Sequence, residues 1–233
     1  NNQMESCQII GKDSIWCIRG GFFMSFTEFI NTPMGAMTGF IIGGFIAFVF
    51  VMIRLTKVKG KEKSQVIRWF NATHAILTCI NDKNVYLYGG VVPGRSWKKL
   101  EREGLRAYWD ITDVNYLNKT IRYLMHNDSE YNNSGEISET DGWDYSRAMS
   151  LLSSGYICAY LTKEEALDRS LEVAKVIQKR FNSWDEFIDS YLKGYEKWSK
   201  HTAMGRWQIY ENLRKEKDSI FSAPWDLELK REW

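Results

Sequence analysis

The longest uncharged stretch of this sequence, from Phe29 to Ile53, most constrains how the chain can fold. Its last part reads MGAMTGFIIGGFIAFVFVMI, 20 residues that would span about 30 Å as an α-helix, which is the hydrocarbon thickness of a bilayer. A secretory signal would have a shorter apolar core and a small-residue cleavage site, whereas this stretch ends at Arg54. A buried core helix would carry a polar stripe. The sequence therefore predicts one transmembrane helix over residues 34–54.

The charges on either side of the predicted span indicate its orientation. Residues 1–33 carry two cations and three acids, whereas residues 54–68 carry six cations and one acid. Because cytoplasmic flanks are enriched in Lys and Arg, residues 1–33 are expected outside the membrane and the long C-terminal part in the cytoplasm. The basic residues after the span are also expected to contact anionic lipid headgroups. These residues are Arg54, Lys57, Lys59, Lys61 and Lys63.

Three glycines recur at every fourth position of the predicted span, namely Gly35, Gly39 and Gly43. This spacing places them on one helix face, where two backbones can approach closely in lipid. The pattern predicts self-association or pairing with another membrane helix. The alternative is that glycine is simply common in membrane helices.

The rest of the chain is predicted to form a basic linker, residues 55–64, and one helical domain, residues 65–233. Nine of the ten tryptophans lie beyond residue 60, which indicates a packed aromatic core. Apolar residues recur at helical spacing in most of the domain, so the fold class is all-α. The predicted helices include residues 65–80, residues 143–155 and two further segments that begin after Thr162 and Ser183. The polar stretch 126–142 is expected to be an exposed loop.

Two helix starts carry the S/T-x-x-E spacing of a capping box. In each, the hydroxyl of the first residue can accept from the backbone N–H three residues later, and the glutamate can accept from the first residue's N–H. The pairs are Thr162 with Glu165 and Ser183 with Glu186. Capping also explains Glu165 and Glu186 without a catalytic role.

The cysteines and histidines predict no metal site and no cofactor. Cys7 and Cys17 fall on the expected outer side, where a disulfide could form, and Cys79 and Cys158 are expected to be buried thiols. No C-x-x-C pair, phosphate-binding loop or nucleophile elbow occurs, and the three histidines are isolated. The chain has 31 cations and 29 acids, and no stretch interleaves basic residues with aromatic ones. The sequence therefore predicts no binding of nucleic acid.

Several segments resemble the bacterial domain of unknown function family 1266. They are RWFNATHAILT, YWDITD, WDYSRAMSLLSSGYICAYLTKEEALD, FNSWDEFIDSYLKGYEKW and the late Pro224-Trp225. The resemblance covers roughly residues 65–229 and implies a bacterial origin, hence the inner membrane as location, but no catalytic role. Its signature positions, which are the candidate site residues, are Trp143, Asp144, Arg147, Trp184, Glu186, Tyr191, Gly194 and Trp198.

Asp144 and Arg147 are three residues apart on one predicted helix and can form an ion pair. Such a pair more often fixes helix packing than forms a site, and the alternative is an arginine-lined pocket for a carboxylate or phosphate. Gly194 lies inside a predicted helix, where it is expected to permit close approach of another helix or of a ligand, and helix packing is the preferred interpretation.

Two functions from different classes follow. The first is a membrane-anchored protein-interaction or scaffold module, with a protein partner that the sequence does not identify. The second is a small hydrolase or toxin-like effector with a site near Asp144, Arg147, Asp185 and Glu186. No residue pattern supports catalysis directly, so the interaction module is preferred.

Overall fold

The computed structural model describes residues 60–126 and 139–233, which belong to one compact unit, Lys57–Trp233. These residues form helices joined by turns, and no strand occurs among them, which confirms the all-α prediction for this part of the chain. The helices are α3 (Gln65–Thr73), α4 (Ala75–Ile80), α5 (Arg95–Trp109), α6 (Val114–His126), α7 (Asp141–Ile157), α8 (Lys163–Arg180), α9 (Trp184–Ser199), α10 (Met204–Lys215) and the 3-10 helix η1 (Ile220–Ser222).

The predicted transmembrane helix, residues 34–54, lies outside the described residues. The same holds for its three glycines, for Cys7 and Cys17, and for the headgroup-binding candidates Arg54, Lys57 and Lys59. From residue 60 onward, no described helix is both long enough and apolar enough to cross a membrane.

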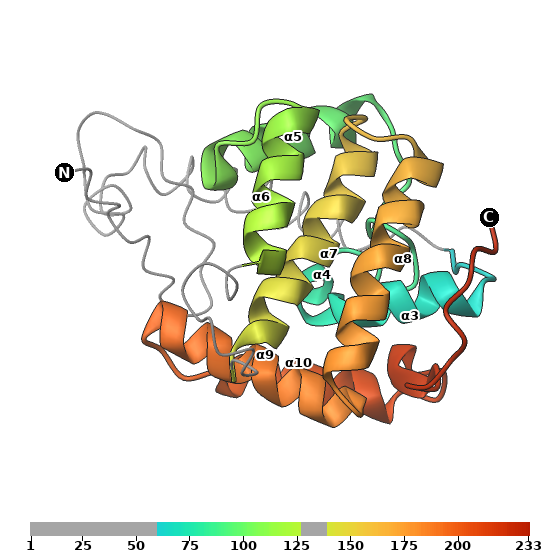
Figure 1. The fold of residues 1–233 in the computed structure, drawn as a ribbon, viewed down its shortest axis with the longest axis vertical. Helices are drawn as coiled ribbons and strands as arrows, with labels where there is room; N and C mark the ends of the chain where they lie inside the picture. The colour runs from blue at the N-terminus through green and yellow to red at the C-terminus, as the bar shows by residue number, and fades with distance from the viewer. Residues whose placement is uncertain (1–59, 127–138) are drawn as a thin grey trace, which may run out of the picture. The chain divides into compact units, whose positions relative to one another are not determined.

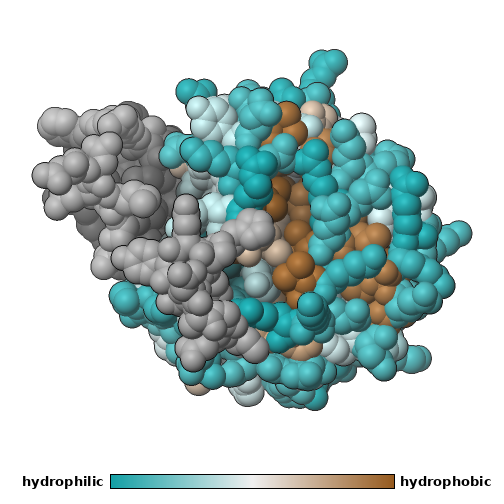
Figure 2. Space-filling model, viewed as in Figure 1, coloured by the Kyte–Doolittle hydropathy of each residue, from teal (hydrophilic) through white to brown (hydrophobic). Residues whose placement is uncertain are grey.

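Helix α7 lies at the centre of the domain, between α6 and α8 and against α9 (Figure 1). Most of its residues are buried, including Met149 and Leu152, so it has no broad polar face. A helix that is buried on most sides must contact several partners, and α7 packs most extensively on α9, α8 and α6. The face seen in Figure 2 is mainly hydrophilic, with hydrophobic residues visible over its middle.

Two glycines let the backbones of α7 and α9 come into contact. A Cβ atom added to Gly142 would lie 2.6 Å from the carbonyl oxygen of Phe187 and 2.8 Å from the amide nitrogen of Tyr191. A Cβ added to Gly194 would lie 2.3 Å from the Cβ of Trp143 and 2.9 Å from the carbonyl oxygen of Thr140. Both helices therefore need glycine at the points where they approach each other.

Three tryptophans from distant segments form the centre of the aromatic core. The ring centroids of Trp69, Trp184 and Trp225 are separated by 4.9 Å (Trp69 to Trp184), 5.4 Å (Trp69 to Trp225) and 4.8 Å (Trp184 to Trp225). Each indole N–H donates to a backbone carbonyl, which removes the cost of burying it. The segment after α10 therefore belongs to the core.

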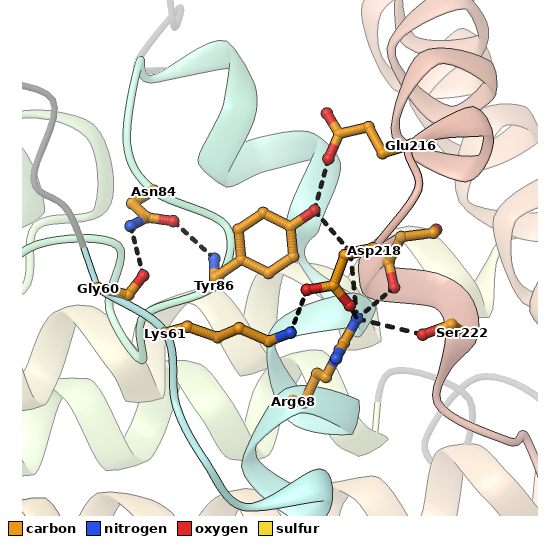
Figure 3. A network of polar contacts seen from close by, with 9 residues as sticks. Gly60, Lys61, Arg68, Asn84, Tyr86, Glu216, Asp218 and Ser222 are labelled. Carbon is orange, nitrogen blue, oxygen red and sulfur yellow. Dashed lines mark hydrogen bonds and ion pairs between the residues drawn. The ribbon is translucent and has the colours of Figure 1, made fainter.

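A network of polar contacts, here called the clasp, joins residues 60–68 to residues 216–222 (Figure 3). Lys61 and Arg68 both bind the carboxylate of Asp218, and Arg68 also donates to the carbonyl of Ser219 at 2.6 Å. The hydroxyl of Tyr86 donates to Glu216 at 2.5 Å. Burial and the hydrogen bond to Glu216 both raise the pKa of Tyr86, so its phenol stays protonated. The clasp fixes the entry into α3.

The first capping box forms as the sequence predicts. Thr162 accepts from the N–H of Glu165 at 3.1 Å, and Glu165 accepts from the N–H of Thr162 at 2.8 Å. These bonds lower the pKa of Glu165. At the start of α9 only half of the box is present. The hydroxyl of Ser183 accepts from the N–H of Glu186, but the Glu186 carboxylate accepts from the N–H of Asn182 instead of that of Ser183.

The predicted bounds of two helices are wrong. The helix expected over residues 65–80 is interrupted at His74, whose φ of −125° and ψ of 19° leave the helical region. There the carbonyl of Phe70 accepts from the Thr73 hydroxyl at 2.7 Å and contacts the His74 ring at 3.0 Å. The helix expected over residues 143–155 runs from Asp141 to Ile157, so the buried Asp141 and Gly142 belong to α7 and not to the exposed loop expected over residues 126–142.

Candidate functional site

The candidate site is centred on Trp143, in the first turns of α7. Its side chain is only 6% exposed, and its ring lies against three aromatic rings of α9. The centroid distances are 5.3 Å to Tyr191, 5.6 Å to Tyr195 and 5.7 Å to Trp198. The close α7–α9 approach at Gly194 brings these rings together.

Two arginines flank the same ring. The guanidinium carbon of Arg147 lies 4.9 Å from the Trp143 centroid, and that of Arg206, from α10, lies 5.5 Å from it. Both distances are within the range of a cation–π contact. We call this group the Trp143 cluster, and it comprises Trp143, Arg147, Tyr191, Tyr195, Trp198 and Arg206.

Arg206 is held almost entirely by aromatic groups. Its guanidinium carbon lies 3.9 Å from the Tyr195 centroid, and its Nη1 donates to the hydroxyl oxygen of Tyr191 at 2.5 Å. No carboxylate pairs with Arg206 within residues 60–126 and 139–233. A cation that is stacked on rings and lacks a carboxylate is a natural contact point for an external acid.

Arg147 is different, because Asp144 binds it as the i, i+3 spacing predicts. Both side chains are largely buried, at 19% and 17% exposure. Arg147 also lies 5.4 Å from the ring of Trp109, at the end of α5. Its Nε and the Nε1 of Trp143 are buried with no hydrogen-bond acceptor among the described residues.

The cluster is suited to binding rather than to proton transfer. Burial raises the pKa of Tyr191 to about 12, although the Arg206 guanidinium opposes the shift, so the phenol is protonated at neutral pH. The cluster holds no histidine or cysteine. In the part of the chain that the structure describes, no group of three or more His, Cys, Asp or Glu side chains could hold a metal ion.

The remaining candidate residues lie elsewhere. Trp184 belongs to the aromatic core, where its Nε1 donates to the carbonyl of Ala223 at 2.8 Å. Glu186 caps the start of α9. Asp185 accepts from the Tyr210 hydroxyl at 2.5 Å and from Arg214 at 2.7 Å. Neither acid shares a hydrogen bond or ion pair with Asp144 or Arg147 among the described contacts, so the structure does not assemble the four residues into one site.

Arg206, Tyr195 and Trp109 are contacts that the sequence interpretation did not place in the site. Arg206 lies in α10, a helix that the sequence analysis did not predict, and no local pattern sets it apart from other surface arginines. Tyr195 follows Tyr191 by four residues, so the aromatic face of α9 was a usable signal for it.

One buried serine–histidine pair resembles a catalytic dyad but lacks access. His74 is 3% exposed, and its Nε2 lies 3.4 Å from the hydroxyl of Ser153, which is also 3% exposed. The other ring nitrogen of His74 contacts the carbonyl of Phe70 at 3.0 Å rather than an acid. The pair therefore connects α7 to the α3–α4 break and has a structural role.

We expect Asp144→Ala to destabilise the domain by about 3 kcal/mol, because it leaves the largely buried Arg147 without its acid. Replacing both Asp144 and Arg147 with leucine should recover most of this loss. Urea unfolding followed by tryptophan fluorescence measures both effects.

The matched control is Asp189→Ala, which breaks the exposed pair between Asp189 and Lys193 on α9. It should change stability by less than about 0.5 kcal/mol. A stable Asp144→Ala variant would contradict the packing role of this pair and favour a ligand-binding one.

Comparison with known proteins adds one match. Residues 129–225 match a family model described as "Protein of unknown function (DUF1266)". No curated protein and no solved structure matched the chain. The part of the chain that carries α7 to η1, and with it the whole Trp143 cluster, is therefore similar to the DUF1266 family.

Proposed function

We propose that this chain is a membrane-tethered protein-binding module, and that the turn between α9 and α10 carries its binding surface. The observation that carries the proposal is a group of large apolar side chains left exposed at this turn. Trp198 is 65% exposed, Met204 63% and Trp207 45%. We call these three residues the corner patch.

The composition of the corner patch is typical of protein interfaces. A single exposed apolar residue is ordinary, but these three fall within residues 198–207, and Trp198 is also part of the Trp143 cluster. Tryptophan and arginine are the residues most enriched among those that dominate binding energy at interfaces. Arg206, between Met204 and Trp207 in α10, adds the arginine.

The charges around the patch favour an acidic partner. Lys197, Lys200 and Arg206 have no acidic partner among the described residues, whereas Lys193 is paired with Asp189. Glu196, the one acid in the sequence between residues 193 and 207, uses its carboxylate to accept from the N–H of Ala203 at 2.7 Å. A protein segment that combines acidic and apolar side chains would complement this surface.

The membrane tether of the proposal is formed by residues 34–54. It is supported by the uncharged run Phe29–Ile53 and by the six cations that follow it.

Site-specific photo-crosslinking in cells tests the proposal. With p-benzoylphenylalanine in place of Trp207, we expect a discrete crosslinked species in the membrane fraction. The matched control places the same group at Val176 on α8, which is similarly exposed at 43%, and should give none.

Charge-reversal variants test whether the cations beside the corner patch contribute to binding. The double change Lys197→Glu and Lys200→Glu should remove the Trp207 crosslink, because it replaces two cations that face the partner with acids. The double change Lys175→Glu and Lys179→Glu, on α8, should leave it unchanged. Equal crosslinking in both doubles, or recovery of the chain in the soluble fraction, would contradict the proposal.

A further inference from the structure

A groove separate from the Trp143 cluster lies where the start of α5 meets the end of α7 and the start of α8. Its volume is about 570 Å³, within the range of small-molecule sites. It is lined by Pro93, Gly94, Lys98, Tyr156, Ile157, Ala159, Tyr160, Leu161, Thr162 and Glu165. From this groove we infer a binding site for a small organic acid with an aromatic or aliphatic body and one carboxylate.

The apolar part of the lining determines which hydrocarbon group the groove can hold. Six of the lining residues carry aliphatic or aromatic side chains, and two of these, Tyr156 and Tyr160, present rings. Aromatic walls bury a large apolar area and accept flat or extended hydrocarbon groups. The groove is therefore suited to a hydrocarbon group of several carbons rather than to a free inorganic ion.

The charged residues of the lining determine which charge the ligand should carry. The groove has one acid, Glu165, and its carboxylate already accepts from the N–H of Thr162 at 2.8 Å. It has one cation, Lys98, which is exposed and has no acidic partner among the described residues. The Glu165 carboxylate stays charged, but it lies in the first turn of α8, where backbone N–H groups offset its charge. No such group among the described residues offsets the charge of Lys98, so the complementary ligand is an anion.

The walls are held in place before any ligand binds. The hydroxyl of Tyr160 donates to the carbonyl of Thr112 at 2.7 Å, and the guanidinium carbon of Arg102 lies 5.1 Å from the Tyr160 ring. The Nε of Arg102 also donates to the carbonyl of Cys158 at 3.0 Å. Ala159 is fixed at a left-handed φ of 58°. A preformed wall reduces the entropy lost on binding.

Matched probes on the full chain in lipid nanodiscs test the inference. Ligand-observed NMR compares 3-phenylpropanoate with 3-phenylpropan-1-ol, which has the same ring and chain but no charge, with empty nanodiscs as background. We expect the anion to bind more tightly by about three- to five-fold, the effect of one exposed ion pair.

Variants assign that preference to the groove. Lys98→Gln should remove the preference for the anion, whereas Lys99→Gln, on the same helix but outside the groove, should keep it. Gly94→Asp introduces a competing carboxylate and should weaken the anion about five-fold. Aspartate at this N-cap position favours α5, and a Cβ there meets no atom within 4 Å, so misfolding would not explain the loss.

Gly94→Asn supplies a neutral cap at the same position and should bind the anion as the unmodified chain does. Equal binding of the two probes, or an unchanged preference in both Lys98→Gln and Gly94→Asp, would overturn the inference. The Trp207 crosslink does not involve this groove, so failure here leaves the proposed function standing.

Discussion

Replacing Gly142 or Gly194 with alanine should destabilise the domain by about 3 kcal/mol or more, which is the upper range for overpacking. At Gly142 the added methyl would meet backbone atoms of Phe187 and Tyr191, and at Gly194 the Cβ of Trp143 and a backbone carbonyl. None of these atoms is at the end of a flexible side chain, so α7 and α9 would have to separate. Urea unfolding of the full chain in mild detergent measures the loss.

Gly104 in α5 and Gly205 in α10 are the controls. A Cβ at either position meets no atom within 4 Å. Alanine there should stabilise the domain by about 0.5–1 kcal/mol, because it restricts the unfolded chain and favours the helix. If Gly142→Ala and Gly104→Ala changed stability in the same direction, the α7–α9 backbone contact would not be as close as described.

The second large effect is a loss of stability in mild acid caused by His74. Burial lowers its pKa from 6.5 to about 4, while the bond to the Phe70 carbonyl opposes the shift and the charge of Lys83 adds to it. Between pH 6.5 and pH 4 the unfolded chain binds a proton at His74 and the folded chain does not. Stability therefore falls as the pH falls through this window, by about 3 kcal/mol at pH 4.

The variant His74→Gln separates this effect from the titration of carboxylates. It should be less stable than the unmodified chain at pH 7, because it loses the ring contacts with Phe70 and Ser153. Its stability should then fall less on acidification, so the two unfolding curves should converge towards pH 4. Parallel pH profiles would mean that His74 titrates normally in the folded chain.

Local signals predicted the helices that local contacts determine. The Thr162–Glu165 box marks the start of α8 because both of its hydrogen bonds form within one turn. The Asp144–Arg147 pair also formed as its spacing predicts, since both partners lie on one helix. Helix α9 begins at the residue after its predicted cap, Ser183.

Contacts between distant segments account for what the sequence analysis missed. The His74 ring at the break contacts Ser153, which is far away in the chain, and Gly155 lies where α7 packs closely against Leu117 of α6 rather than at a helix end. Trp184 and Trp143 are both tryptophans near a helix start. Only their tertiary contacts show that Trp184 belongs to the aromatic core and Trp143 to the candidate site. Arg206 could not be assigned because its partners lie on α7 and α9.

The clasp and the last residues bring the two ends of the described domain together. The hydroxyl of Ser64 donates to Glu232 at 2.6 Å, and the indole N–H of Trp233 donates to Asp168 at 3.0 Å. A force that pulls residue 60 away from residue 233 would act first on these few polar bonds. These bonds would break in sequence before the force acted on the helices that pack around α7. The domain would yield to tension at its edge while its aromatic core stayed folded.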